Sequence, residues 1–99
     1  MRLTTEQIAV IKQKTALIFG EDARVFLFGS RVDDTKKGGD IDLFIDLPNQ
    51  IERPTAKILY LNGLLQQVLG VQKIDIIFYT PSYDWQPIHT AAKETGILL

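Results

Sequence analysis

Hydrophobic and polar residues follow two periods along this chain, and each period predicts one kind of element. A period near 3.6 residues, typical of amphipathic helices, predicts helices over residues 5–19 and 54–69. Short runs rich in isoleucine, valine and phenylalanine predict strands over residues 23–28, 40–46 and 73–79.

Two shorter elements complete the prediction. Ser30 is a suitable cap for a short helix over residues 30–34, and a last helix is predicted over residues 85–95. The order is helix, strand, short helix, strand, helix, strand, helix. We therefore expect an α/β (α+β) fold in a single domain of residues 1–99, with a small sheet and helices packed against it.

Residues at the ends of the two long helices support their boundaries. Thr4 and Gln7 fit a capping box, and Gly20 suits the position after the last turn. Pro54 fits the first turn of the second long helix, and Gly70 ends it.

Alternation along the second and third predicted strands sorts their side chains onto two faces. In the second strand, isoleucine and leucine share one face, and the other face carries Asp40, Asp42, Phe44 and Asp46. The corresponding face of the third strand consists of Lys73, Asp75, Ile77 and Tyr79. If these strands are neighbours, their aspartates can lie together.

Composition limits the classes of protein to which this chain can belong. Its formal net charge is -1, so it lacks the basic surface with which proteins grip nucleic acid through bulk electrostatics. The absence of cysteine excludes disulfides, thiolate metal sites and cysteine nucleophiles. No signal peptide is recognisable, and no apolar run approaches the roughly 20 residues of a membrane span. We therefore expect a cytoplasmic protein without membrane contact.

Gly29 and Ser30, at the end of the first predicted strand, are the first candidates for chemistry. A strand that ends in small residues and opens a helix offers free backbone N–H groups to a phosphate. Gly29 permits close approach, Ser30 adds a hydroxyl donor, and Arg31 can add a charge-assisted contact. The same dipeptide is also common in turns, so a turn without a ligand is the alternative.

Asp40 and Asp42 occupy positions i and i+2 of a predicted strand and therefore project on the same side. Two carboxylates so close repel each other unless a cation compensates them, and Mg²⁺ prefers such hard oxygen ligands. The alternative is a turn aspartate at Asp40 followed by a solvated aspartate on an edge strand.

Asp75 lies in a strand that is otherwise nearly all apolar, so we expect it to be well buried and to need a cation. Lys73 or Arg24 is the alternative to a metal ion as its partner. If Asp75 joins Asp40 and Asp42 beside a phosphate site, the three carboxylates have the layout of two-metal phosphoryl or nucleotidyl transfer. Asp75 would then accept the proton of the attacking hydroxyl.

The order Gly29-Ser30, a spacer of nine residues, Asp40-x-Asp42 and a later Asp75 resembles the nucleotidyltransferase superfamily typified by DNA polymerase β. The spacer is one residue shorter than is common there. In its size and in residues 87–92 and 96–98, the chain is similar to the minimal nucleotidyltransferases, the MntA-like antitoxins of HEPN–MNT pairs. The resemblance implies a polymerase β-like fold over nearly the whole chain.

The resemblance also implies roles for the candidates. Gly29 and Ser30 would contact the β and γ phosphates of a nucleoside triphosphate, with Arg31 as a helper. Both members of the Asp-x-Asp pair would bind two Mg²⁺ ions, and Asp75 would bind the catalytic ion and assist deprotonation.

The function implied by the resemblance is transfer of AMP from ATP to a tyrosine of a partner HEPN toxin, by the antitoxin of a type VII-like toxin–antitoxin pair. A chain of 99 residues has no room for an acceptor-binding domain, which also favours a protein acceptor or a partner subunit in a homo- or hetero-oligomer. Two alternatives stay open: an antitoxin with a silent site that acts by binding alone, and a nucleotidyltransferase with a small-molecule acceptor.

Other residues have open assignments. Lys36 and Lys37 can reach a triphosphate or stay solvated, and Trp85 can stack on a base or pack in the fold. His89 is the only histidine, and without a partner it is expected to pack or to lie at the surface.

Overall fold

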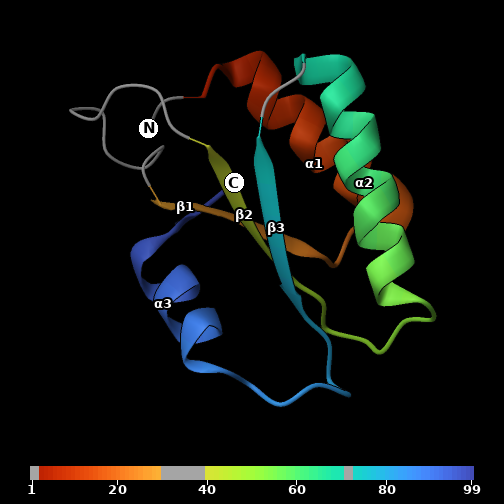
Figure 1. Ribbon diagram of the computed structural model, residues 1–99, viewed down its shortest axis with the longest axis vertical. Coiled ribbons are helices and arrows are strands. Elements are labelled where there is room, and N and C mark those ends of the chain that lie inside the picture. The colour runs from red at the N-terminus through yellow and green to blue at the C-terminus, as the bar shows by residue number, and fades with distance from the viewer. Residues whose placement is uncertain (1–2, 30–39, 71–72) are drawn as a thin grey trace.

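Three helices and a mixed sheet of four strands form the described part of the chain. The computed structural model describes residues 3–29, 40–70 and 73–99. In chain order the elements are α1 (Thr5–Phe19), β1 (Arg24–Phe28), β2 (Ile41–Asp46), α2 (Pro54–Leu69), β3 (Ile74–Tyr79), α3 (Pro87–Thr95) and β4 (Ile97–Leu98) (Figure 1). The short helix predicted over residues 30–34 lies outside the described ranges.

The sheet has the strand order β3-β2-β1-β4. Strand β1 is antiparallel to both of its neighbours, whereas β2 is parallel to β3, and α2 connects these two parallel strands. Parallel neighbours require a crossover of this kind, because the chain must return to the same end of the sheet. The small mixed sheet with flanking helices confirms the predicted fold class.

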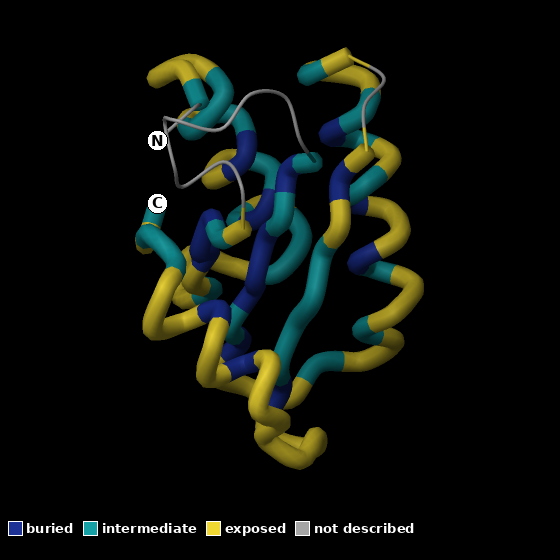
Figure 2. Tube along the Cα trace, turned by 60° about the vertical axis from the view of Figure 1, so that its left-hand side comes forward, coloured by how far each residue is buried: buried dark blue, intermediate teal, exposed yellow. Residues whose placement is uncertain are grey.

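Helices cover the two faces of the sheet unequally. On one face α1 and α2 lie side by side (Figure 1). The main core beneath them includes Ile11, Val25, Leu27, Ile41, Leu43, Ile45, Leu61 and Leu65. On the other face α3 packs through Ala92 on Phe26 and Phe44. Figure 2 shows that burial is concentrated in the central strands. The β2 side chains are sorted as predicted, because its isoleucines and Leu43 belong to the main core and Phe44 belongs to the core under α3.

The two long helices have the predicted bounds. The Thr4 hydroxyl accepts a hydrogen bond from the Gln7 N–H (3.1 Å), and the Gln7 side chain accepts one from the Thr4 N–H (2.8 Å). Gly20 and Gly70 follow the last turns of α1 and α2 with positive φ angles of 96° and 88°. None of the helices in the described ranges is both long enough and apolar enough to cross a membrane.

The C-terminal end differs from the prediction. Helix α3 begins at Pro87, two residues later than expected, and β4 was not predicted. Ile97 and Leu98 pair with β1, and the Leu99 N–H donates to the Val25 carbonyl (2.9 Å). A strand of two residues is too short for alternation to reveal it, so only its pairing with β1 identifies it.

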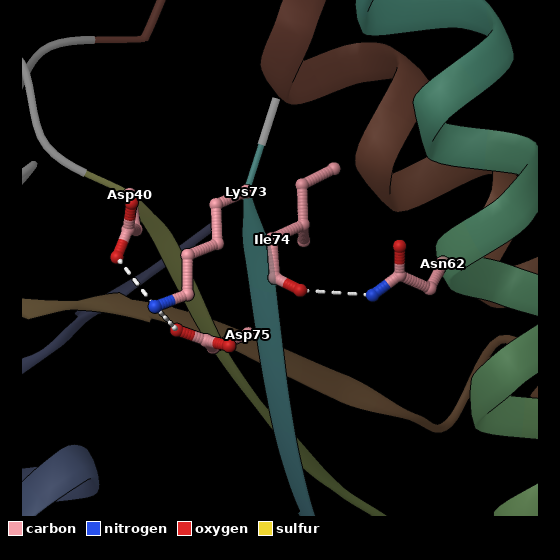
Figure 3. A network of polar contacts seen from close by, with 5 residues as sticks. All are labelled: Asp40, Asn62, Lys73, Ile74 and Asp75. Carbon is pink, nitrogen blue, oxygen red and sulfur yellow. Dashed lines mark hydrogen bonds and ion pairs between the residues drawn. The ribbon is translucent and has the colours of Figure 1, made fainter. Parts of the chain in front are cut away.

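Asn62 satisfies a backbone carbonyl on the outer side of an edge strand. Strand β3 lies at the edge of the sheet, and the Asn62 amide, on α2, donates to the Ile74 carbonyl (2.8 Å; Figure 3). Gln66, one turn later, donates to Asn62 Oδ1 (3.2 Å) and so fixes the orientation of the amide. Asn62 thereby anchors the end of β3 that is next to Lys73 and Asp75.

We expect Asn62→Ala to lower the free energy of unfolding by about 1–2 kcal/mol, because it leaves a partly buried carbonyl without this donor. Urea denaturation measures the change. Gln67→Ala, on the exposed side of the same helix, is the matched control and should change stability by less than about 0.5 kcal/mol. Equal effects of the two variants would contradict an anchoring role for Asn62.

Candidate functional site

Strand pairing brings Asp42 and Asp75 side by side. The parallel register of β2 and β3 sets Asp42 opposite Asp75, and the antiparallel register of β1 and β2 sets Phe28 opposite Asp42. Side chains that are opposite each other in neighbouring strands project from the same face. Both carboxylates therefore lie on the face that α3 partly covers, and Gly29, which follows Phe28, lies beside them.

Gly29 is required by its backbone conformation and by its surroundings. Its φ of 76° is in the left-handed region that favours glycine. A Cβ at this position would overlap the Asp42 carboxylate oxygen Oδ2. The close approach that the sequence predicts at Gly29 is thus made to Asp42, and contact of Gly29 with a phosphate stays a prediction.

Lys73 lies between Asp40 and Asp75. Its Nζ is 3.5 Å from Asp40 Oδ2 and 4.0 Å from Asp75 Oδ2 (Figure 3). A backbone hydrogen bond from the Ile41 N–H to the Lys73 carbonyl (3.1 Å) aligns the starts of β2 and β3. The alternative in which Lys73 is the partner of Asp75 therefore has support, and the same ammonium also faces Asp40.

The charges around Asp42 favour the binding of a cation. Burial raises the pKa of the Asp42 carboxyl above its ordinary value, the charges of Asp75 and Asp40 raise it further, and Lys73 lowers it. Three carboxylates against one ammonium leave an excess of negative charge, which makes ionisation of Asp42 less favourable. A bound cation would relieve this repulsion.

The predicted burial of Asp75 is wrong, because its side chain is 53% exposed. Strand β3 is an edge strand, and α3 packs over Phe26 and Phe44, further along the sheet, rather than over Asp75. An apolar strand sequence does not reveal which part of its face a helix will cover. Asp75 is consequently open to solvent and to a ligand.

The three aspartates suit a hard divalent cation, although the Lys73 ammonium lies close to two of them. Asp40, Asp42 and Asp75 offer carboxylate oxygens, which Mg²⁺ prefers. Within the described ranges, no three acidic, histidine or cysteine side chains stand close enough together to hold a metal ion. Binding of one cation by all three aspartates would therefore require their side chains, and that of Lys73, to rearrange.

The remaining candidates either lie outside the described residues or have a structural role. The predicted phosphate contacts fall outside the described residues and stay predictions: they are those of Ser30, Arg31, Lys36 and Lys37. Asp46, on the same face of β2, pairs with Lys93 of α3 (3.6 Å) at the far end of the strand. This ion pair is structural.

His89 and Trp85 take part in the packing of α3 against the sheet. His89 is 6% exposed, and its Nδ1 accepts a hydrogen bond from the Gln86 N–H (2.9 Å). This assigns the proton to Nε2, which donates to the Phe78 carbonyl (3.1 Å). The rings of His89 and Trp85 both contact Phe44. With both ring nitrogens engaged, His89 has a structural role.

Sequence reasoning missed the full position of Lys73 and the role of Asn62. The sequence suggests Lys73 only as a partner of Asp75. Its position two residues before Asp75, on the same face of the strand, was the signal that it could reach the whole carboxylate cluster. Asn62 stands next to Leu61, beside the apolar stripe of α2, and a polar residue in that place was the signal of a contact to the sheet.

Comparison with known proteins gives one family. The family model described as a nucleotidyltransferase domain matches residues 8–98, a span that includes Gly29 and the three aspartates. A search of curated proteins found no significant match. The mixed sheet with flanking helices agrees with the polymerase β-like fold that the resemblance implies.

The raised pKa of Asp42 gives a pH-dependent stability. The folded protein holds the Asp42 proton more tightly than the unfolded chain, whose aspartate pKa is about 3.9. As the pH rises from this value through the higher pKa of the folded state, ionisation of Asp42 therefore lowers the stability of the fold. We expect Asp42→Asn to raise the melting temperature at pH 7, and the gain to disappear as the pH falls below about 3.9. Thermal denaturation at a series of pH values measures it.

Asp22→Asn, at an exposed turn position, is the control for this measurement and should show no such gain. A gain for Asp42→Asn that stays the same at every pH would contradict the electrostatic explanation.

Proposed function

The chain belongs to the nucleotidyltransferase domain family, and on that premise we propose that it moves AMP from ATP to a protein acceptor at Asp40, Asp42 and Asp75. One observation carries the proposal: the register of β2 and β3 sets Asp42 beside Asp75 on an open part of the sheet face. Asp40 lies close to this pair, because the Lys73 ammonium contacts both Asp40 and Asp75.

The triphosphate is proposed to bind at the end of β1. There the backbone of Gly29 lies against Asp42, and no side chain stands between them. Ser30 and Arg31 are proposed to add a hydroxyl and a guanidinium donor to the phosphates. Phosphate donors and carboxylates would then meet at one end of the sheet, which positions the α-phosphorus for transfer.

The residues fit Mg²⁺, because Asp40, Asp42 and Asp75 offer carboxylate oxygens and carry an excess of negative charge. Two Mg²⁺ ions held by these residues would neutralise charge on the triphosphate and lower the pKa of the acceptor hydroxyl.

The proposed reaction is an in-line displacement. The acceptor oxygen forms a bond to the α-phosphorus while the bond to the β-phosphate oxygen breaks, and pyrophosphate leaves with the electron pair. The hydroxyl proton passes to the carboxylate of Asp75, which is exposed enough for an acceptor to approach. Gly29 and Ser30 hold the leaving pyrophosphate through their donors.

An open site favours a large acceptor. The side chains of Asp40 and Asp75 are 43% and 53% exposed, so a tyrosine on the surface of another protein can reach them. On the resemblance to the MntA-like antitoxins, we propose that this protein is a HEPN-type toxin and that its modification silences it. An antitoxin that acts by binding alone, and an enzyme with a small-molecule acceptor, are the alternatives.

Label transfer tests the proposal. The protein is incubated with Mg²⁺ and the HEPN-type toxin, once with α-labelled and once with γ-labelled ATP. We expect label on the toxin from the α position only, and a fall of at least about 100-fold in Asp42→Asn. The matched control is Asp46→Asn, on the same face of the same strand, where an aspartate pairs with Lys93 instead; it should keep transfer within about threefold.

Each alternative predicts a different result. Unchanged transfer by Asp42→Asn would contradict the catalytic assignment. Protection of cells by Asp42→Asn without any labelled toxin would support the antitoxin that acts by binding alone. Label that appears on a small molecule and never on protein would support the small-molecule acceptor.

A further inference from the structure

Lys73 occupies a position that the transfer reaction does not explain. Its Nζ lies 3.5 Å from Asp40 Oδ2 and 4.0 Å from Asp75 Oδ2, although 68% of its side chain is exposed and could extend into water (Figure 3). The backbone confines its starting point, because the Lys73 carbonyl accepts from the Ile41 N–H and the adjacent Ile74 carbonyl accepts from α2.

An ammonium in this position has two opposite effects. It lessens the repulsion between Asp40 and Asp75 and so stabilises the protein when no other cation is bound. It also competes with any other cation for the oxygens that face it, because those oxygens cannot hold both at full strength. The first effect keeps the carboxylates together, and the second lowers their affinity for a metal ion.

We propose that Lys73 is an internal counter-ion of the carboxylate site, which holds Asp40 and Asp75 together before a divalent cation binds and is displaced when one does. Lys73 therefore lowers the affinity of the site for the free cation while it stabilises the cation-free protein. This inference rests on the proposed function in one respect, namely that the three aspartates take a divalent cation.

Binding of Mn²⁺ to the full chain without nucleotide tests the inference by isothermal titration calorimetry at low ionic strength. Lys73→Met keeps the aliphatic stem and removes the charge. We expect it to bind Mn²⁺ about fivefold more tightly than the wild type, the factor that corresponds to one exposed charge pair at this separation. Lys73→Arg keeps the charge and should stay within about twofold of the wild type.

Melting temperature in EDTA is the second readout, because Lys73→Met should lower it by about 1–4 °C while it raises the affinity for Mn²⁺. The matched control is Lys93→Met, which breaks an ion pair of similar length with Asp46 on the same sheet face (3.6 Å). It should also lower the melting temperature but leave the affinity for Mn²⁺ unchanged.

The outcomes separate this inference from the proposed function. Equal or weaker Mn²⁺ binding by Lys73→Met would overturn the counter-ion role and leave the proposed function standing. Tighter binding by both methionine variants would also overturn it, since the effect would not be specific to Lys73. Failure of all variants to bind Mn²⁺ would overturn both the inference and the metal-dependent mechanism.

Discussion

The register of β2 against β3 is the constraint on which the site depends. Strand side chains alternate with a period of two, so a slip of one residue would turn Asp75 toward α1 and α2 and away from Asp42. The apolar side chains of β3, Ile74 among them, pack under these helices and would lose that burial in the slipped register. Hydrophobic burial on one face of the sheet therefore sets the distance between the carboxylates on the other face.

The same register has an electrostatic cost. It places the Asp42 carboxylate beside Asp75, and the pairing of β1 with β2 places the same carboxylate against the backbone of Gly29. Burial and like charge there raise the pKa of Asp42. Lys73 offsets part of this repulsion, because its ammonium faces Asp75 and Asp40. The remaining repulsion and desolvation at Asp42 lower the stability of the fold. Burial of the apolar side chains of β2 offsets this loss. Local unfavourable interactions of this kind are typical of functional sites.

The sequence predicts the features that depend on periodicity. It does not predict features that depend on which other helix or strand packs against a given segment. The bounds of α1 and α2 and the two faces of β2 follow from capping and alternation. Alternation also puts Asp42 and Asp75 on one face on the condition that β2 and β3 are neighbours, and the structure meets this condition. The burial of Asp75 does not, because it depends on the part of the sheet that α3 covers. Strand β4 was missed since only its pairing with β1 defines it. The roles of Ser30 and Arg31 stay predictions, since both lie outside the described residues.

Helix α3 divides the face that carries the carboxylates into a covered part and an open part. Phe44 is fully buried and stacks with Phe26 and His89, whereas Asp42, two residues earlier on the same face, lies next to the exposed Asp75. Neighbouring positions on one face of a strand are only about 7 Å apart, so the Asp42 carboxylate stands directly beside the packed ring of Phe44. This packing holds the backbone of β2 in place, while the side chains of Asp40 and Asp75 stay exposed. Exposed carboxylates on an open face can serve a reacting group carried by another protein, whereas a small acceptor is usually oriented by the walls of a pocket. This physical argument underlies the proposal of a protein acceptor over a small molecule.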